Sequence, residues 1–257
     1  GLLDGRVVIV TGAGGGIGRA HARLLAKEGA AVVVNDLGGA RDGTGESHSM
    51  ADTVVSEIKA DGGRAVAHYG SVTDKDAAAN MIATAISEFD RVDILIANAG
   101  GPPPGNFAST GLDAYPDALQ LNLLSTVALC KALIPPMQRR GWGRVVAITS
   151  VSVRQPIDQL ILSTTARAGL TAFLKTTATE VAPDGVTVNT VQPGLHATAR
   201  LGQLYDDLDA VAANVPTRRL GDPADFGRVV AFVCSEAARS ITGASIPVDG
   251  GAARGLQ

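Results

Sequence analysis

The stretch from Ile148 to Thr176 contains three polar side chains whose spacing could build one active site. Ser150 follows an apolar, β-branched run, and Ser163 and Arg167 lie four residues apart in the helical pattern that follows, so they share one helical face. Hydroxyl and guanidinium groups can polarise a carbonyl or hold a developing oxyanion. None of them is a good proton donor near neutral pH, because arginine keeps its proton and serine is a weak acid.

Four other residues are candidates for the missing acid or base. His196 ranks first because imidazole titrates near neutrality, although an exposed loop histidine is an equal interpretation. Asp158 lies in the loop before the helix and ranks below His196. Tyr205 could swing inward, but a surface role is favoured. Lys175 follows Arg167 by eight residues, about 12 Å along a helix, so its ammonium is too far away to act beside Arg167.

A glycine-rich turn near the start of the chain predicts a dinucleotide site. The apolar run 6–11 leads into TGAGGGIG, which places Gly12, Gly16 and Gly18 between a predicted strand and an amphipathic helix. Gly12 permits the tight turn, and Gly16 lets backbone amides approach a pyrophosphate at the positive end of the helix. Gly18 lets the helix pack closely on the strand.

Asp36 selects between the two nicotinamide dinucleotides. It follows Gly18 by eighteen positions, at the end of the second predicted strand. A carboxylate there accepts hydrogen bonds from ribose hydroxyls and repels a 2′-phosphate. Arg19 and Arg41 could instead attract a 2′-phosphate, but we interpret both as surface arginines. The predicted cofactor is therefore NAD.

Strand and helix patterns alternate along the chain and predict the elements that position these residues. Strands are predicted over 6–11, 31–35, 64–69, 93–98, 144–149, 186–191 and 244–248, and helices near 17–29, 50–60, 74–89, 113–139, 160–182 and 223–236. Such alternation implies right-handed crossovers and an open sheet. The predicted fold class is α/β: a single-domain, Rossmann-type doubly wound fold over residues 1–257, with a seven-stranded parallel sheet flanked by helices. Residues 37–49 form a polar insert, and 196–216 a mobile cover over the site.

Composition narrows the possible functions. A net charge of −3 without a basic stripe argues against a nucleic-acid partner. The longest apolar tract, 118–137, is broken by polar residues and two prolines, so no membrane span is expected. Cys130 and Cys234 lie in apolar, helical surroundings and are predicted to be buried thiols of a reducing compartment. No export signal precedes the first strand, which favours a cytoplasmic location and leaves a removed leader open.

The order of these motifs resembles the short-chain dehydrogenase/reductase family. TGxxxGIG is followed by NAG at Asn98–Gly100, then Ser150, PG at Pro193–Gly194 and VDGG at Val248–Gly251, so the resemblance spans essentially the whole chain. Residues 1–92 look most like the hydroxyacyl-CoA dehydrogenase domain of peroxisomal multifunctional type 2 enzymes and their bacterial relatives. The remainder resembles a divergent subgroup similar to 3-oxoacyl-acyl-carrier-protein reductases.

The family pattern has a serine at the end of the fifth strand, a tyrosine thirteen residues later and a lysine four beyond. Ser150 matches the serine, while Ser163 and Arg167 stand at the other two positions, so the tyrosine and lysine are absent. Asn122 matches the helix asparagine of the family's tetrad. Losing a positioned acid typically removes about 10²–10⁴ in rate, and oxyanion stabilisation could retain a comparable factor. The predicted catalytic residues are Ser150, Ser163, Arg167, Asn122 and His196.

The resemblance also implies the remaining cofactor contacts. Arg167 would bridge the nicotinamide ribose hydroxyls, and Thr198 would bind the carboxamide. Ser71 stands where relatives often carry an aspartate beside the adenine, which loosens the adenine assignment. The predicted cofactor-binding residues are Gly12, Gly16, Ile17, Gly18, Asp36, Val72, Asn98, Ala99, Gly100, Arg167, Pro193, Gly194 and Thr198, and no metal site is predicted.

The predicted function is that of an NAD(H)-dependent oxidoreductase which interconverts a hydroxyl and a carbonyl on a small molecule, either an oxoacyl thioester or a ketone. One alternative is a redox-silent enzyme for aldol-type cleavage, elimination or isomerisation, with His196 or Asp158 as base. Another is a non-catalytic dinucleotide-binding protein. The two long apolar helices 113–139 and 160–181, together with the resemblance, predict a homotetramer or homodimer.

Overall fold

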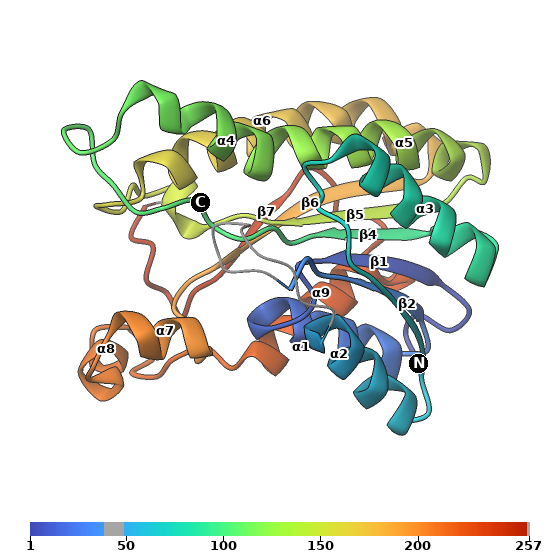
Figure 1. Ribbon diagram of the computed structural model, residues 1–257, viewed down its shortest axis with the longest axis horizontal. Coiled ribbons are helices and arrows are strands. Elements are labelled where there is room, and N and C mark those ends of the chain that lie inside the picture. The colour runs from blue at the N-terminus through green and yellow to red at the C-terminus, as the bar shows by residue number, and fades with distance from the viewer. Residues whose placement is uncertain (39–48, 256–257) are drawn as a thin grey trace.

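Seven parallel strands form one twisted sheet in the computed structural model, which describes residues 1–38 and 49–255 (Figure 1). The strand order is β3-β2-β1-β4-β5-β6-β7. Strands β2 and β3 are added on one side of β1, and β4 to β7 on the other, so the order of strands switches sides between β1 and β4. The strands are β1 (Val7–Thr11), β2 (Ala31–Asn35), β3 (Arg64–His68), β4 (Ile94–Ala97), β5 (Gly143–Ile148), β6 (Val186–Pro193) and β7 (Ser245–Val248). The predicted fold class is confirmed, and each strand end lies within two residues of its predicted position.

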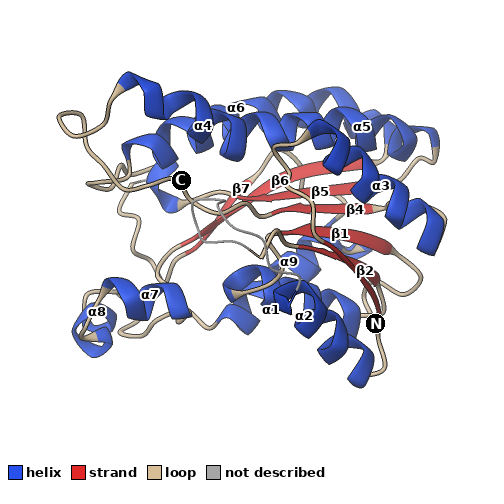
Figure 2. Cartoon of the chain, viewed as in Figure 1, coloured by secondary structure: helices blue, strands red, loops and turns tan. Residues whose placement is uncertain are grey.

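Helices cover both faces of the sheet, which is why the central strands are apolar on both sides (Figure 2). One face carries α1 (Gly16–Lys27), α2 (Ser49–Ala60) and α9 (Pro223–Cys234). The other carries α3 (Lys75–Phe89), α5 (Ser125–Arg139) and α6 (Ile161–Val181). Apart from α5, which forms only the second half of the predicted helix 113–139, these helices begin and end within two residues of their predicted positions.

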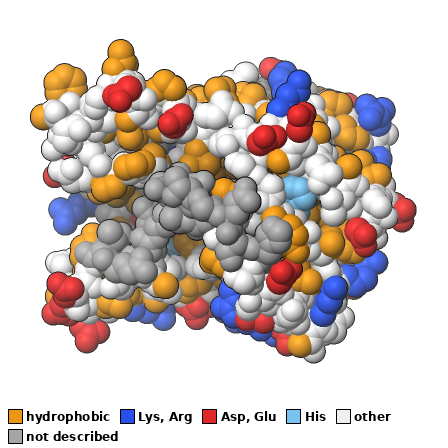
Figure 3. Space-filling model, viewed as in Figure 1, with side chains coloured by type: hydrophobic (Ala, Val, Ile, Leu, Met, Phe, Trp, Pro, Cys, Tyr) orange, Lys and Arg blue, Asp and Glu red, His pale blue; other side chains and the backbone are white. Residues whose placement is uncertain are grey.

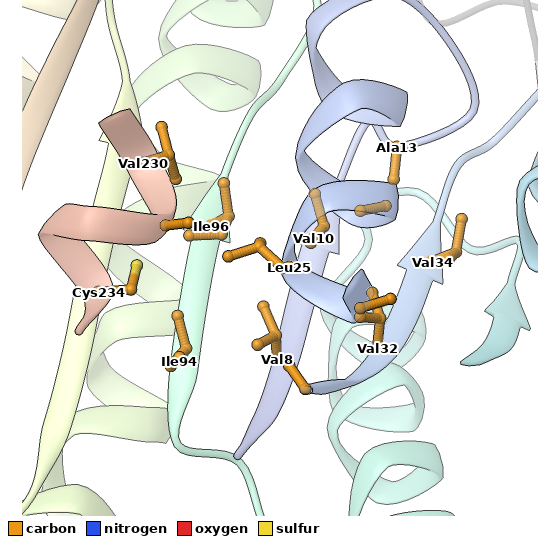
Figure 4. Packing of buried hydrophobic residues seen from close by; sticks show 14 of the residues in the cluster. Val8, Val10, Ala13, Leu25, Val32, Val34, Ile94, Ile96, Val230 and Cys234 are labelled. Carbon is orange, nitrogen blue, oxygen red and sulfur yellow. The ribbon is translucent and has the colours of Figure 1, made fainter. Parts of the chain in front are cut away.

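The core beneath α1 and α9 illustrates how a strand and a helix pattern meet (Figure 4). Val8 and Val10 of β1 and Ile94 and Ile96 of β4 are fully buried and contribute every second side chain to this face. Leu25 of α1 and Val230 of α9 cover them. This packing holds α1, and therefore the glycine turn before it, at a set height above the sheet.

The predicted helix 113–139 is not uniform. The chain is helical from Leu112 to Arg139 through η1 (Leu112–Ala114), α4 (Tyr115–Leu119), a π-helical turn η2 (Gln120–Leu124) and α5. Within the described residues it is the one helix long and apolar enough to cross a membrane, by length and composition alone. It packs against β5 and α6, so it is a core helix of this fold. π turns in helices often mark functional sites.

The shorter helices lie in the connections. They are η3 (Val151–Val153), η4 (Ala182–Asp184), α7 (Ala199–Leu204), α8 (Leu208–Ala213) and η5 (Glu236–Ala238). The segment 196–216 contains α7 and α8 and is otherwise irregular. Most of the polar insert 37–49, including Arg41, lies outside the described residues. Cys130 and Cys234 are buried free thiols, as predicted, and burial raises the pKa of each to about 12.

Candidate active site

The glycine turn between β1 and α1 can be built only from glycine at its critical positions. Gly12 and Gly16 have φ angles of 59° and 51°. A Cβ at Gly18 would lie 2.0 Å from the carbonyl oxygen of Gly12, and one at Gly12 would lie 2.1 Å from that of Asn98. Helix α1 then begins after Gly15 with no side-chain cap. Its first backbone N–H groups therefore lack a side-chain partner, the arrangement that a bound pyrophosphate requires.

Asn98 secures this turn to the neighbouring strand. Its backbone N–H donates to Oγ1 of Thr11 at 2.9 Å, and its Nδ2 donates to the carbonyls of Thr11 and Gly12 at 3.2 and 3.0 Å. The end of β4 and the turn after β1 are thus joined by one side chain. Asn98, which was predicted to be a cofactor-binding residue, therefore fixes the position of the turn.

The Asp36 carboxylate is held against the glycine turn at the end of β2. Its Oδ2 accepts from the N–H of Gly14, and its Oδ1 accepts from that of Gly38, both at 2.7 Å. An ionised carboxylate has further lone pairs for ribose hydroxyls. Gly14 was not among the predicted residues, although the run of three glycines after Ala13 could have indicated it.

Arg19 does not face Asp36. It makes a bidentate ion pair with Glu57 of α2, with Nε–Oε2 and Nη2–Oε1 distances of 2.9 and 2.5 Å. The hydrogen bond to Glu57 raises the pKa of Arg19 and lowers that of Glu57. The positive charge of Arg19 on α1 is therefore paired with the carboxylate of Glu57 on α2, as expected for a surface arginine.

The remaining cofactor candidates lie around the same edge of the sheet. Thr198 lies over the turn, with its Cγ2 atom 3.7 Å from where a Cβ of Gly16 would be. Gly194, after the end of β6, donates its N–H to Val248 at 3.1 Å. Ile17 is partly buried and packs against the core cluster beneath α1. Val72 is half-buried in the turn after β3.

Arg167 is the centre of a hydrogen-bond network at the carboxyl ends of β4 and β5. Its Nε donates to Oγ of Ser163 at 3.2 Å, and its Nη1 donates to the carbonyl of Ile148 at 2.7 Å. Its Nη2 donates to the carbonyls of Ala99 and Gly100 at 3.3 and 3.2 Å. Arg167 as a whole residue is only 8% exposed. Arg167 therefore fastens two strand ends to α6, a role that its sequence position did not predict.

Asn122 joins this network from the π turn η2. Its Nδ2 donates to the carbonyl of Gly100 at 2.7 Å, so Asn122 and Arg167 share one acceptor. The residue is 1% exposed, and its Oδ1 has no hydrogen-bond partner among the described protein atoms. The extra residue in the π turn brings this amide toward the sheet edge, where the family's asparagine is expected.

Ser150 and Ser163 are half-buried at the same edge. The Oγ of Ser150 caps η3 by accepting from the N–H of Ser152 at 3.0 Å. The Oγ of Ser163 accepts from Arg167. Each hydroxyl thus receives one hydrogen bond from the protein and keeps its own O–H as a donor.

His196 lies in the opposite layer from this network, contrary to its predicted catalytic role. Its ring is 5% exposed and meets Phe226 of α9 edge-on, with centroids 4.9 Å apart. Its Nδ1 lies 3.2 Å from the carbonyl oxygen of Gly194, which can only accept, so this nitrogen carries the proton. Burial lowers the pKa of His196. A ring enclosed on the α9 face cannot deliver a proton on the α6 face, so this placement does not suit His196 as the acid.

The other proton-transfer candidates are also placed. Asp158 is exposed, Tyr205 is 45% exposed, and Lys175 donates to the carbonyl of Gly243 at 2.9 Å, away from Arg167.

Figure 3 shows an indentation at the left of the molecule, between the part that contains α4 and the part that contains α7 and α8. Hydrophobic side chains gather on both sides of it, at the carboxyl edge of the sheet.

Comparison with known proteins identifies the family. A family model described as enoyl-(acyl carrier protein) reductase matches residues 12–253. The chain belongs to the short-chain dehydrogenase/reductase family. A short-chain type dehydrogenase/reductase of Mycobacterium tuberculosis is 40% identical over 249 residues, which cover 97% of this chain and 83% of that protein. A cyclohexanol dehydrogenase of a Rhodococcus species is 37% identical over 260 residues, covering 97% and 96%.

A solved member of the family has the same fold. The structure of a 7α-hydroxysteroid dehydrogenase complexed with NADH and 7-oxo glycochenodeoxycholic acid matches with a TM-score of 0.89 at 31% identity, over 99% of this chain and 97% of that one. Short-chain dehydrogenases/reductases are oxidoreductases that use nicotinamide dinucleotides, so the prediction of an enzyme of this kind is confirmed.

Proposed function

We propose that this chain is an NAD(H)-dependent oxidoreductase that interconverts a hydroxyl and a carbonyl on a small molecule, with serines and an arginine in place of the usual proton-donating pair. The substrate is an oxoacyl thioester or a ketone. The observation that supports this most directly is the network of Arg167, Ser163 and Asn122, which meets at the Gly100 carbonyl beside the glycine turn. It keeps the reacting edge of the sheet ordered without a tyrosine or a lysine.

The described residues fit the cofactor. The open N-terminus of α1 suits the pyrophosphate, the Asp36 carboxylate suits ribose hydroxyls, and Thr198 stands over the turn where it can reach the carboxamide end. When bound, NADH supplies a hydride to a carbonyl carbon, and NAD accepts one from an alcohol. Asp36 favours NAD(H), because a 2′-phosphate would stand beside a carboxylate while Arg19 is paired with Glu57.

The chain's own part in the reaction is to hold the substrate oxygen. The O–H groups of Ser150 and Ser163 donate to it, and the charge of Arg167 strengthens the Ser163 donor through the Nε–Oγ hydrogen bond. Developing negative charge on that oxygen is stabilised in this way. Ser163 is half-buried, so water can reach this edge and protonate the product alkoxide while the serine hydroxyls hold it.

The redox-silent alternative has less support. It requires a base near the substrate, yet His196 is enclosed against Phe226 and Asp158 is exposed in its loop. An assay of NADH absorbance with a panel of ketones and oxoacyl thioesters tests the redox proposal directly. Measurable NADH binding without any absorbance change would contradict it and favour the alternative.

Replacing Asp36 by alanine is expected to weaken NADH binding and to narrow the preference for NADH over NADPH by about tenfold, or roughly 1.4 kcal/mol. An acceptor for the ribose and a repulsive charge are lost together. Dissociation constants from NADH and NADPH fluorescence titrations measure the change. Asp36→Asn is the control, since it keeps an acceptor for Gly14 or Gly38 but removes the charge. Unchanged relative affinity in both variants would exclude Asp36 from the ribose site.

The same proposal includes self-association through α5 and α6. A groove of about 410 Å³ runs between them, lined by apolar side chains such as Ile134 and Phe173 and edged by Lys131 and Glu180. We expect sedimentation to give a dimer or tetramer at micromolar concentration. Phe173→Asp should shift it to the 26.1 kDa monomer, because a carboxylate would be buried without a partner. Phe107→Asp, at a side chain 88% exposed outside the groove, is the control. A monomeric wild type would refute this part.

A further inference from the structure

Met50 is an apolar side chain placed where the dinucleotide turn and the Asp36 carboxylate meet. It belongs to the first turn of α2 and is 39% exposed, so it is not a core residue. A Cβ added at Gly14 would lie 2.8 Å from the Cβ of Met50, and one at Gly15 would lie 3.2 Å from its terminal methyl. The methionine therefore extends along both glycines, from Gly14 to Gly15.

Gly14 is enclosed between this side chain and the acid. The same added Cβ would lie 2.7 Å from Cγ of Asp36, and the Gly14 N–H donates to Oδ2 of Asp36 at 2.7 Å. Met50 thus forms an uncharged wall next to this hydrogen bond. Such a wall keeps water away from the carboxylate and strengthens its interactions with nearby groups.

The arginines of α1 that face α2 cannot neutralise an anion at this wall. Arg19 is paired with Glu57, and Arg23 lies 3.0 Å from Asp61 and 3.7 Å from Glu57. A phosphate beside Asp36 would therefore meet one carboxylate and one thioether among these described groups. A ribose hydroxyl would instead find an acceptor and an apolar surface.

We propose that Met50 is a specificity-determining residue of the dinucleotide site: its side chain excludes a 2′-phosphate and supports binding of an unphosphorylated adenosine ribose. The inference rests on the proposed NAD(H) function and adds a second determinant to Asp36. Met50 acts by occupying the space beside Gly14 and Gly15 with an uncharged group. A cation at this position would reverse the preference, because it would pair with the phosphate.

The test measures dissociation constants for NADH and NADPH with the full chain. Met50→Arg is expected to raise the affinity for NADPH relative to NADH by about tenfold, the equivalent of one modest charge-assisted contact. Ile86→Arg is the matched control, since Ile86 is a 52% exposed apolar residue on α3 and adds the same charge elsewhere. Met50→Leu keeps an uncharged side chain at this position and should retain the wild-type preference for NADH over NADPH.

The outcomes separate this inference from the function on which it rests. A Met50→Arg protein that keeps the wild-type circular dichroism spectrum and binds both dinucleotides in the wild-type ratio would overturn the role of Met50, while the NAD(H) proposal would stand. An equal shift in the Ile86→Arg protein would also overturn it, because overall charge would then explain the change. A wild type that binds neither dinucleotide would overturn both proposals.

Discussion

Replacing Ser163 by tyrosine and Arg167 by lysine together is expected to raise NADH-dependent reduction of an activated ketone by up to about 10²–10⁴, the factor that a positioned general acid supplies. A phenol has a pKa of about 10, and a neighbouring ammonium lowers it toward working pH. The rest of the site is already assembled: Ser150 at the end of β5, Asn122 bonded to Gly100, and the glycine turn beside them.

The gain will be limited by what Arg167 holds together. Its guanidinium donates to the carbonyls of Ile148, Ala99 and Gly100, whereas a lysine ammonium has three donors at a single point. A tyrosine must also fit where a serine stands, and such overpacking typically costs about 1–3 kcal/mol. We therefore expect Arg167→Lys alone to lose stability without gaining rate, and Ser163→Tyr alone to gain less than the pair.

Initial rates for the wild type, both single variants and the double variant provide the measurement, with NADH affinity determined for each. The affinity control prevents a binding defect from being taken for lost chemistry. A double variant that folds and binds NADH but stays as slow as the wild type would contradict the positional equivalence of Ser163 and Arg167 with the family's pair. It would also favour the redox-silent alternative.

Acidification from pH 7 to pH 4 is expected to cost the folded protein about 3 kcal/mol through His21 alone. His21 of α1 is fully buried beside Phe226, and neither of its ring nitrogens has a hydrogen-bond partner among the described residues. Burial, together with the charge of the nearby His196, lowers its pKa to about 3. Charging such a ring inside the core is unfavourable.

The pKa of His21 in the unfolded and in the folded chain decides how the free energy of unfolding changes with pH. Above about pH 6.5 His21 is neutral in both states and does not alter stability. Between about 6.5 and the folded value of about 3 the unfolded chain binds a proton that the folded chain does not. The free energy of unfolding therefore falls by about 1.4 kcal/mol per pH unit in this window.

Urea unfolding at pH 7.5, 6, 5 and 4 measures this slope, and His21→Leu should reduce it by about one proton. The variant should be no less stable than the wild type at pH 7.5, because it replaces two unpartnered buried nitrogens with apolar atoms. His68→Leu is the comparison: His68 lies 3.0 Å from Asn35 Nδ2 and 3.2 Å from Asn80 Oδ1, so its loss should destabilise at every pH. An unaltered slope in His21→Leu would show that this histidine does not titrate as described.

The fold class and the glycine turn could be predicted from the sequence, because hydrophobic periodicity and glycine conformation are local properties. The alternation of β-branched runs and amphipathic patterns predicts the sheet and its two helical layers. The positive φ of Gly12 and the contact of Gly18 with the Gly12 carbonyl are what the TGAGGGIG motif requires. Asp36 at the end of β2 follows from the same reasoning. The sequence by itself thus determined the fold class and the residues around the dinucleotide turn.

Tertiary packing decided which way several side chains point and what they bond. Spacing after Gly194 places His196 near the site along the chain, but Phe226 of α9 draws its ring into the opposite layer. Ser163 and Arg167 share a helical face, yet the bonds from Arg167 to Ile148 and Gly100 depend on how β4, β5 and α6 meet.

Two further features of the site depend on neighbours that are distant in sequence. The predicted helix 113–139 contains a π turn at Gln120–Leu124, which brings Asn122 to the Gly100 carbonyl. Met50 reaches Gly14 only because α2 packs beside α1. Position along the chain follows from local rules, whereas the direction of a side chain depends on contacts that no short stretch of sequence contains. The sequence therefore determined where the site lies, and the tertiary structure decided which residues can act in it.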